Sequence, residues 1–134
     1  MYKVRIEDSF AAAHFLRDYH GKCENLHGHN YKVRVYLRGE NLSEGGMLYD
    51  FSDLKKDLKG ALNTIDHTNL NDLPVFDQNP SAERIAVYIY NGIIDFLKNE
   101  GLDLSYKKGK KTPALYAVDV FETETSRARY RVDE

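Results

Sequence analysis

The chain has 134 residues, of which 42% are hydrophobic and 30% charged, a composition typical of one globular domain spanning residues 1–134. Its formal net charge of −2 argues against a nucleic-acid-binding protein, and no apolar run reaches the roughly 20 residues that a membrane span needs. The alternating N-terminus predicts no signal peptide. The single cysteine, Cys23, excludes a disulfide within the chain and favours a reducing, cytoplasmic location.

The first part of the chain predicts a β-hairpin. Apolar and charged residues alternate from Tyr2, and the pattern continues loosely to His14. It resumes clearly over residues 31–38. Alternation with a period of two is typical of strands, so we expect these two segments to pair. Their connection, residues 15–26, is much longer than the usual 2–5 residues of a hairpin loop, and such long loops are usually functional or disordered.

Two helices are predicted in the middle of the chain. Asp50 or Ser52 is expected to cap the first, and Asn79 precedes the second, with Pro80 at its first position and Gly101 at its end. Residues 66–79 between them predict a loop. The apolar faces of the two helices comprise Leu54, Leu58, Ala61, Leu62 and Ile65, and then Ile85, Ala86, Ile89, Ile93, Phe96 and Leu97.

Two further strands are predicted over residues 115–121 and 127–132, after a lysine-rich segment, 107–111. The element order is therefore β-β-α-α-β-β. We expect an α+β fold in which a four-stranded antiparallel sheet carries two helices on one face. The exposed edges of such a sheet favour association with other chains.

Four of the five histidines fall within sixteen residues. His27 and His29 are two positions apart at the start of a strand, so both side chains project from one face. If the strands pair as a hairpin, His14 joins them from the neighbouring strand. Three imidazoles with one open position predict a zinc site that polarises a substrate oxygen. A histidine pair at a strand entrance that binds no metal is the alternative.

Cys23 lies four residues before His27, inside the long loop. As a buried residue it would be a small hydrophobe. Beside a metal and Lys22 it would be a thiolate that acts as nucleophile or base. It could also be the fourth metal ligand, and its spacing from His27 does not separate these three interpretations.

Five segments, taken together and in order, resemble the motifs of one known family. They are Phe-Ala-Ala-Ala-His at 10–14, Cys-x-x-x-His-Gly-His-Asn-Tyr at 23–31, Asp-His-Thr-Asn-Leu-Asn at 66–71, Asn-Pro-Ser-Ala-Glu at 79–83 and Val-Phe-Glu-Thr at 120–123. The family is that of the 6-pyruvoyltetrahydropterin and 6-carboxytetrahydropterin synthases. The resemblance covers nearly the whole chain.

This resemblance implies the tunnelling fold, in which trimers close a barrel and two trimers stack into a homohexamer with active sites at subunit interfaces. Three residues separate Cys23 from His27, which is similar to the 6-carboxytetrahydropterin synthases of queuosine biosynthesis. The pyruvoyl-forming branch typically has five. The implied substrate is the pterin 7,8-dihydroneopterin triphosphate, and the implied products are 6-carboxy-5,6,7,8-tetrahydropterin, acetaldehyde and triphosphate.

The resemblance also implies a role for each site residue. His14, His27 and His29 would bind Zn²⁺, and Cys23 would remove a proton from the substrate side chain. His67 would move a second proton, Asp66 would orient His67, and Glu122 would anchor the pterin ring through two N–H bonds. Without the resemblance, we would expect His67 to brace a loop, Asp66 to be a turn residue and Glu122 to be a solvated carboxylate at a strand end.

Three departures from the family pattern, Ile65, Ser81 and Arg84, touch no implied ligand. They loosen the assignment of substrate contacts near the second helix. The lysines of segment 107–111 would either hold triphosphate or form a solvated loop.

The rival functions are 6-pyruvoyltetrahydropterin synthase, which eliminates triphosphate without carbon–carbon cleavage, a non-catalytic zinc-binding subunit, and a structural zinc site with Cys23 as fourth ligand.

Overall fold

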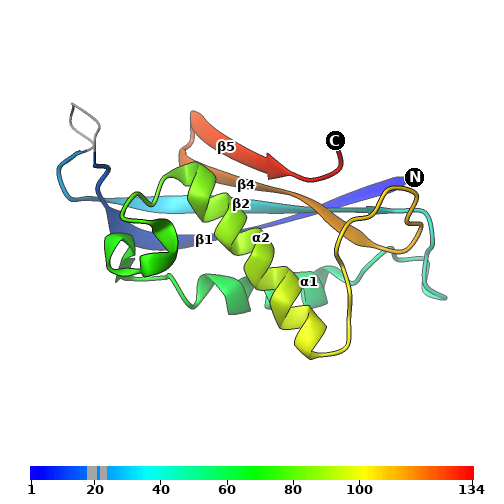
Figure 1. Ribbon diagram of the computed structural model, residues 1–134. Helices are drawn as coiled ribbons and strands as arrows, with labels where there is room; N and C mark the ends of the chain where they lie inside the picture. The colour runs from blue at the N-terminus through cyan, green and yellow to red at the C-terminus, as the bar shows by residue number, and fades with distance from the viewer. Residues whose placement is uncertain (18–20, 22–23) are drawn as a thin grey trace.

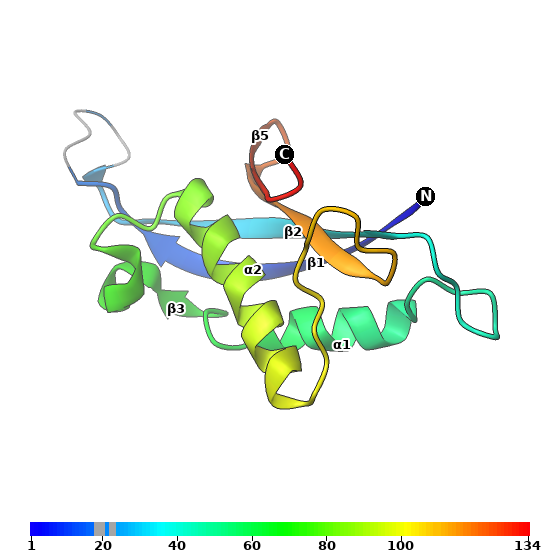
Figure 2. The ribbon, with the colours of Figure 1, turned by 45° about the vertical axis from the view of Figure 1, so that its right-hand side comes forward.

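The computed structural model describes residues 1–17, 21 and 24–134, and Cys23 lies outside them. Five strands form one sheet in the order β3-β1-β2-β4-β5, and both helices cover the same face of it (Figures 1 and 2). The strands are β1 (Tyr2–His14), β2 (His27–Gly39), β3 (Thr68–Asn69), β4 (Ala114–Thr123) and β5 (Ser126–Arg131), and the helices are α1 (Phe51–Leu62) and α2 (Ala82–Asn99). No helix in the described part of the chain is long and apolar enough to cross a membrane.

The predicted hairpin is confirmed. β1 and β2 pair antiparallel from Tyr2 opposite Gly39 to His14 opposite His27, without a shift in register. The connection between the two strands therefore has the predicted bounds. At its closed end the hairpin brings the two histidines side by side.

The predicted strand count is wrong, because the described residues contain five strands rather than four. β3 is parallel to β1, pairing Thr68 with Ala12 and Asn69 with Ala13, so the sheet is not purely antiparallel. Residues 66–79 were expected to be a loop, but they also contain two 3-10 turns, η2 (Leu70–Asp72) and η3 (Pro74–Phe76). A two-residue strand has no periodicity, so the sequence gives no signal for it. The barrel assembly concerns several chains and stays a prediction.

Helix α1 is capped as predicted, since the Asp50 side chain accepts a hydrogen bond from the Ser52 backbone N–H (2.7 Å). The predicted start of α2 is wrong by two residues. Ser81 is the N-cap and accepts from the N–H of Arg84 (3.3 Å), so Pro80 lies outside the helix. Gly101 follows the C-cap with a φ of +83°, the left-handed conformation that glycine adopts readily.

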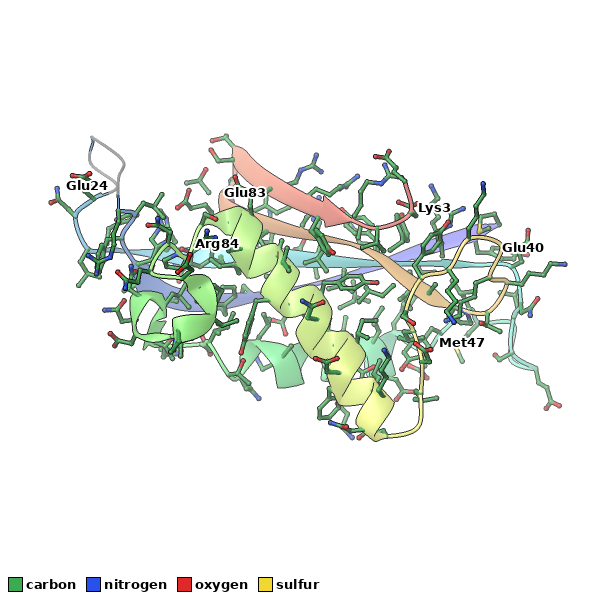
Figure 3. All side chains as sticks on the ribbon, in the orientation of Figure 1. Lys3, Glu24, Glu40, Met47, Glu83 and Arg84 are labelled. Carbon is green, nitrogen blue, oxygen red and sulfur yellow. The ribbon has the colours of Figure 1, made fainter. Side chains whose placement is uncertain are left out.

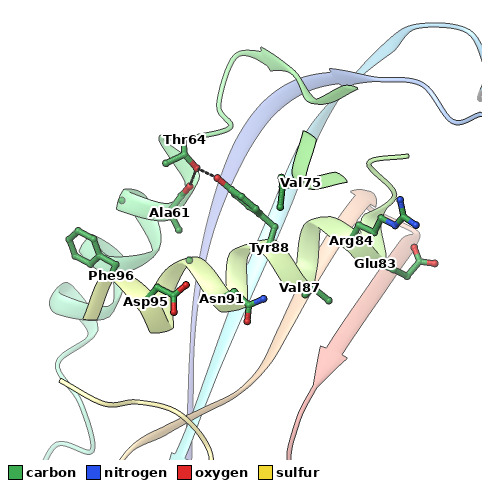
Figure 4. Close-up of a pocket in the computed structure, with 12 residues that line it drawn as sticks. Ala61, Thr64, Val75, Glu83, Arg84, Val87, Tyr88, Asn91, Asp95 and Phe96 are labelled. Atoms are coloured by element: carbon green, nitrogen blue, oxygen red, sulfur yellow. Dashed lines mark hydrogen bonds between the residues drawn. The ribbon is translucent and has the colours of Figure 1, made fainter. Parts of the chain in front are cut away.

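The core lies between the sheet and the helices. Alternate β2 residues from Tyr31 to Leu37 are fully buried there, and so is Ile65, although it lies beyond the end of α1. Phe96 is the exception to the predicted stripe of α2, with 45% of its surface exposed. It borders a groove of about 580 Å³ between the outer sides of α1 and α2, where Thr64 and Tyr88 share a hydrogen bond (Figure 4).

The opposite face of the sheet carries a buried carboxylate. Asp119, on β4, is 0% exposed and accepts hydrogen bonds from the Tyr36 hydroxyl (2.6 Å), from Arg129 Nε and Nη2 (2.7 and 3.0 Å) and from Arg127 (3.3 Å). Burial by itself would raise the pKa of this carboxyl. The hydrogen bonds from Arg129 and Tyr36 and the nearby positive charges outweigh burial, so the pKa is lowered.

Because the folded pKa of Asp119 is depressed, its contribution to stability is present above the unfolded pKa of about 3.9 and is lost as the pH falls through the folded pKa. We expect Asp119→Asn to lower the free energy of unfolding at pH 7 by about 1–3 kcal/mol. The difference from wild type should shrink at pH 3, as measured by urea denaturation. Asp95→Asn, at an exposed position of α2, is the control. An equal loss at both pH values would contradict this account.

Candidate metal centre

Three histidines meet at the closed end of the β1–β2 hairpin. His14 and His27 are paired across the strands, and His29 follows two residues later on the same face. Their ring centroids are 4.5 to 5.1 Å apart. One ligand atom from each histidine and one from Glu122 lie within 4.8 Å of one another, so the four side chains can share one metal ion.

Backbone carbonyls fix the protonation of two of these rings. His14 Nδ1 lies 2.8 Å from the Pro80 carbonyl oxygen, and His27 Nδ1 lies 2.6 Å from that of Asn25. A carbonyl only accepts, so in both rings Nδ1 carries the proton and donates it. In the neutral ring Nε2 then presents a lone pair, which is the arrangement that metal-binding histidines use.

The buried nitrogens of this cluster have no hydrogen bond among the described residues. His14 Nε2 and His29 Nε2 are both buried without one, although Glu122 Oε1 lies 3.0 and 3.2 Å away. Burial lowers the pKa of the His29 imidazole; Glu122 opposes this shift, and His14 and His27 add to it. In the neutral rings of His14 and His27 the Nε2 atom is an acceptor, and so are the oxygens of Glu122, so a cation bound between them would satisfy all three. The residues therefore fit a metal ion, and three nitrogens with one oxygen are donors that zinc accepts.

The position of Glu122 is a feature that the sequence analysis missed. It was expected to anchor the pterin, or to be a solvated strand-end carboxylate, but the structure places it among the histidines with 28% of its side chain exposed. Its register explains this. Val120 pairs with Val33 across β4 and β2, so Glu122 continues the same face towards Tyr31 and His29.

Asp66 and His67 lie beside the outer edge of β1. His67 has a φ of +58°, and its backbone N–H donates to the Ala11 carbonyl (2.6 Å). Asp66 Oδ1 accepts from the Ala11 N–H (2.9 Å) and lies 3.0 Å from His67 Nδ1. The Ala11 N–H, more than His67, lowers the pKa of the Asp66 carboxyl. The carboxylate is thus ionised and in contact with the imidazole.

The His67 side chain is 82% exposed and, with His29, lines a cleft of about 520 Å³. This cleft is slightly smaller than the groove between α1 and α2, which contains none of the predicted site residues. We assign the site to the cleft because His29 and His67 line it, and size alone does not identify it.

Asn71 holds the end of β1 against this region, a role that nothing in the sequence indicates beyond the place of Asn71 in the motif. Its side chain accepts from the Phe15 N–H (2.8 Å) and donates to the Phe15 carbonyl (2.9 Å) and to the Gln78 carbonyl (3.1 Å). It thereby ties the residue after His14 to the turns that precede α2.

The lysine segment 107–111 lies at the other end of the sheet. Glu40 and Asn41, just after β2, donate backbone hydrogen bonds to the Lys111 carbonyl. β2 has 13 residues, about 43 Å at 3.3 Å per residue, and the histidines are at its start. Figure 3 shows Glu40 and Glu24 at these opposite ends. Within one chain, these lysines do not reach the metal centre.

The comparisons with known proteins identify the family of the chain. Residues 3–133 match the family model described as 6-pyruvoyl tetrahydropterin synthase. The chain is 39% identical over 135 residues to 6-carboxy-5,6,7,8-tetrahydropterin synthase of Synechocystis, covering 97% of this chain and 93% of that protein. It is 36% identical to human 6-pyruvoyl tetrahydrobiopterin synthase, covering 92% and 86%. The solved structure of the Caenorhabditis elegans 6-pyruvoyl tetrahydropterin synthase superposes with a TM-score of 0.79 at 32% identity, covering 98% and 96%.

Three histidines on the β1–β2 hairpin and a glutamate on β4, on a sheet backed by two helices, together with these matches, define an α+β protein of the pterin synthase class. The chain belongs to the 6-pyruvoyl tetrahydropterin synthase family.

Removal of one histidine should strongly weaken metal binding. We expect wild type to bind one zinc ion per chain and His27→Ala to bind at least about 100-fold more weakly, since loss of a ligand exceeds the 10–100-fold effect of losing an outer partner. His67→Ala is the matched control and should keep its metal. Elemental analysis and competition with a chromogenic chelator measure both. Full metal retention in His27→Ala would contradict the assignment of His27 as a metal ligand.

Loss of the three Asn71 side-chain hydrogen bonds should affect both stability and metal affinity. Asn71→Ala removes three hydrogen bonds, and we expect it to lower the free energy of unfolding by about 1–3 kcal/mol. Because Asn71 holds Phe15, the residue next to His14, zinc should also bind less tightly. Asn91→Ala, on the exposed side of α2, should stay within about 0.5 kcal/mol. Denaturation curves measure stability and titrations measure zinc affinity. Equal values for Asn71→Ala and Asn91→Ala would contradict the role of the Asn71 hydrogen bonds.

Proposed function

We propose that this chain converts 7,8-dihydroneopterin triphosphate to 6-carboxy-5,6,7,8-tetrahydropterin, releasing acetaldehyde and triphosphate, and that it depends on zinc. The observation that carries the proposal is the meeting of His14, His27, His29 and Glu122 at one point. The carboxy-forming branch is supported by the 39% identity to the Synechocystis enzyme and by the three residues between Cys23 and His27.

His14, His27 and His29 would hold the zinc ion, each in its neutral form. When bound, zinc supplies positive charge that stabilises negative charge developing on a substrate oxygen. The carbonyls of Pro80 and Asn25 keep two of the rings in the ligand tautomer. Burial of His29 favours the same neutral form.

Cys23 is proposed as the base that removes a proton from the substrate side chain. A thiol near a metal ion and cationic side chains has a depressed pKa, which provides thiolate near neutral pH. The resemblance of residues 23–31 to the family motif supports this role, and the Cys23 side chain lies outside the described residues.

His67 is proposed to move a second proton. Its exposed ring lines the same cleft as His29, which leaves it accessible to a bound substrate. The ionised Asp66 carboxylate, 3.0 Å from Nδ1, holds the ring's orientation and stabilises the imidazolium that forms when Nε2 takes a proton.

Glu122 is proposed to receive the pterin ring. A carboxylate has two oxygens and pairs well with two parallel N–H donors. Oε1 faces His14 and His29, and the partly exposed side chain can also meet a ligand from outside. We infer that this one carboxylate links the metal centre to the heterocycle.

A homohexamer with active sites at subunit interfaces is also proposed. β5 is an outer strand, and β3 covers β1 only at Ala12 and Ala13. Two open edges on one sheet support pairing with further copies of the chain.

The sister activity, 6-pyruvoyltetrahydropterin synthesis, is the second candidate, and the similarity to the human and C. elegans enzymes favours it. The products separate the two activities. Incubation with 7,8-dihydroneopterin triphosphate should release acetaldehyde in step with triphosphate. Triphosphate without acetaldehyde would assign the sister activity instead.

Cys23→Ala should keep one zinc ion per chain and lose about 10²–10⁴-fold in kcat, the usual contribution of a general base. Cys23→Ser, which keeps the side-chain size but not the acidity, should behave in the same way. Acetaldehyde release and metal content are measured on the same samples. Loss of zinc from Cys23→Ala would show that sulfur is a metal ligand, and unchanged turnover would show that it is not the base.

A further inference from the structure

One oxygen of Glu122 lies where a fourth metal ligand would be expected among the three histidines. Oε1 is 3.0 Å from His14 Nε2 and 3.2 Å from His29 Nε2, so the same oxygen makes both contacts. In a tetrahedral zinc site with bonds of about 2.0–2.2 Å, neighbouring ligand atoms are about 3.3–3.6 Å apart. The contacts of Oε1 are close to this spacing. The position that three histidines alone would leave open is therefore filled by the carboxylate in the structure.

The strand is irregular where it carries this carboxylate. Phe121 pairs with Arg127 and Thr123 with Ser126, so the β4–β5 ladder shifts its register at Glu122 and pairs it with no described residue of β5. Such irregularities are common next to active sites, where they change the direction of a side chain. The backbone at Glu122 is thus less constrained than the regular ladder on its N-terminal side.

Glu122 reaches from the solvent into a buried cluster. Its side chain is 28% exposed, whereas that of His14 is 1% exposed and that of His29 is 19% exposed. A bound molecule can approach the exposed part of the glutamate, but Oε1 lies beside buried nitrogens and is difficult to reach from outside. A ligand that needs both oxygens of this carboxylate requires the side chain to turn outward.

The two roles of Glu122 require different positions. A pterin presents its amino and ring N–H groups at the end of the fused rings that is opposite the substrate side chain. If the side chain of the substrate meets the histidine cluster, the N–H groups lie away from it. Pairing with two parallel N–H donors also uses both carboxylate oxygens. One carboxylate cannot fill the fourth position and pair with the far end of the ring at the same time.

We propose that Glu122 closes the metal centre in the absence of substrate and opens it by turning towards the pterin ring. This inference rests on the proposed function, because the ring is the trigger. The carboxylate exchanges its contact with the cation for two N–H bonds from the ring. The position that it leaves becomes available to an oxygen of the substrate side chain. A molecule without the heterocycle finds this position filled, so recognition of the ring controls access to the metal.

Cobalt-substituted protein tests the exchange without turnover, since the visible absorption of Co²⁺ changes with the number and kind of its ligands. The probes are pterin, which has the ring but no side chain, and azide, which binds an open metal position. We expect saturating pterin to change the wild-type spectrum and to lower the Kd of azide at least about tenfold. In Glu122→Gln, azide should bind equally well with and without pterin, within about twofold.

Zinc affinity provides a second measurement. Loss of an outer partner of a metal site weakens metal binding by about 10–100-fold, so Glu122→Gln should raise the Kd of zinc at least about tenfold. Glu124→Gln is the matched control, because it removes the same charge at an exposed position two residues away, and it should stay within about twofold. Circular dichroism checks that both variants fold.

The outcomes separate this inference from the proposed function. An unchanged zinc Kd in Glu122→Gln overturns the exchange, and so does azide binding by wild type that is independent of pterin. If pterin binds, as followed by its fluorescence, but leaves the cobalt spectrum unchanged, Glu122 is a fixed ligand and the exchange is wrong, while the proposed reaction stands. If pterin changes the spectrum but no acetaldehyde is released, the exchange stands and the proposed reaction is wrong.

Discussion

The register of the β1–β2 hairpin is the constraint on which the metal centre depends. The two strands pair over their full length without a shift, whereas the β2–β4 and β4–β5 pairs each contain one. A slip of one residue would turn His27 and His29 to the other face. Phe10 stacks on the buried Tyr31 at 4.8 Å, directly beside the histidines, and this contact fixes the register where it matters most.

The surrounding loops orient the paired histidines so that they could bind a metal ion. A histidine on a strand offers either nitrogen, and the partner of Nδ1 decides which one remains available. Pro80, immediately before the N-cap of α2, supplies that partner for His14, and Asn25 supplies it for His27. The chain turns into α2 one residue after the carbonyl that His14 needs. The start of the helix is therefore part of the site as well as part of the fold.

Sequence reasoning predicted the parts of this structure that have a period. The hairpin, both helices and the last two strands follow from alternating or helical patterns, and the histidine cluster follows from the hairpin. It missed β3, which is two residues long, and it misplaced the first residue of α2 because proline suits that position in general. Glu122 joins the histidines through pairing of β2 with β4, a contact between segments about ninety positions apart. No local pattern encodes such a contact.

The β4–β5 hairpin gives the two faces of the sheet different chemistry. Because alternate residues of a strand point to opposite faces, Glu122 joins the histidine cluster while Phe121 and Asp119 lie on the face turned away from the helices. The arginines of β5 stand next to Asp119, whose carboxylate offsets part of their mutual repulsion and holds them in place. One short hairpin thus contributes a carboxylate to the histidine cluster on one face of the sheet and a buried, arginine-paired carboxylate to the other.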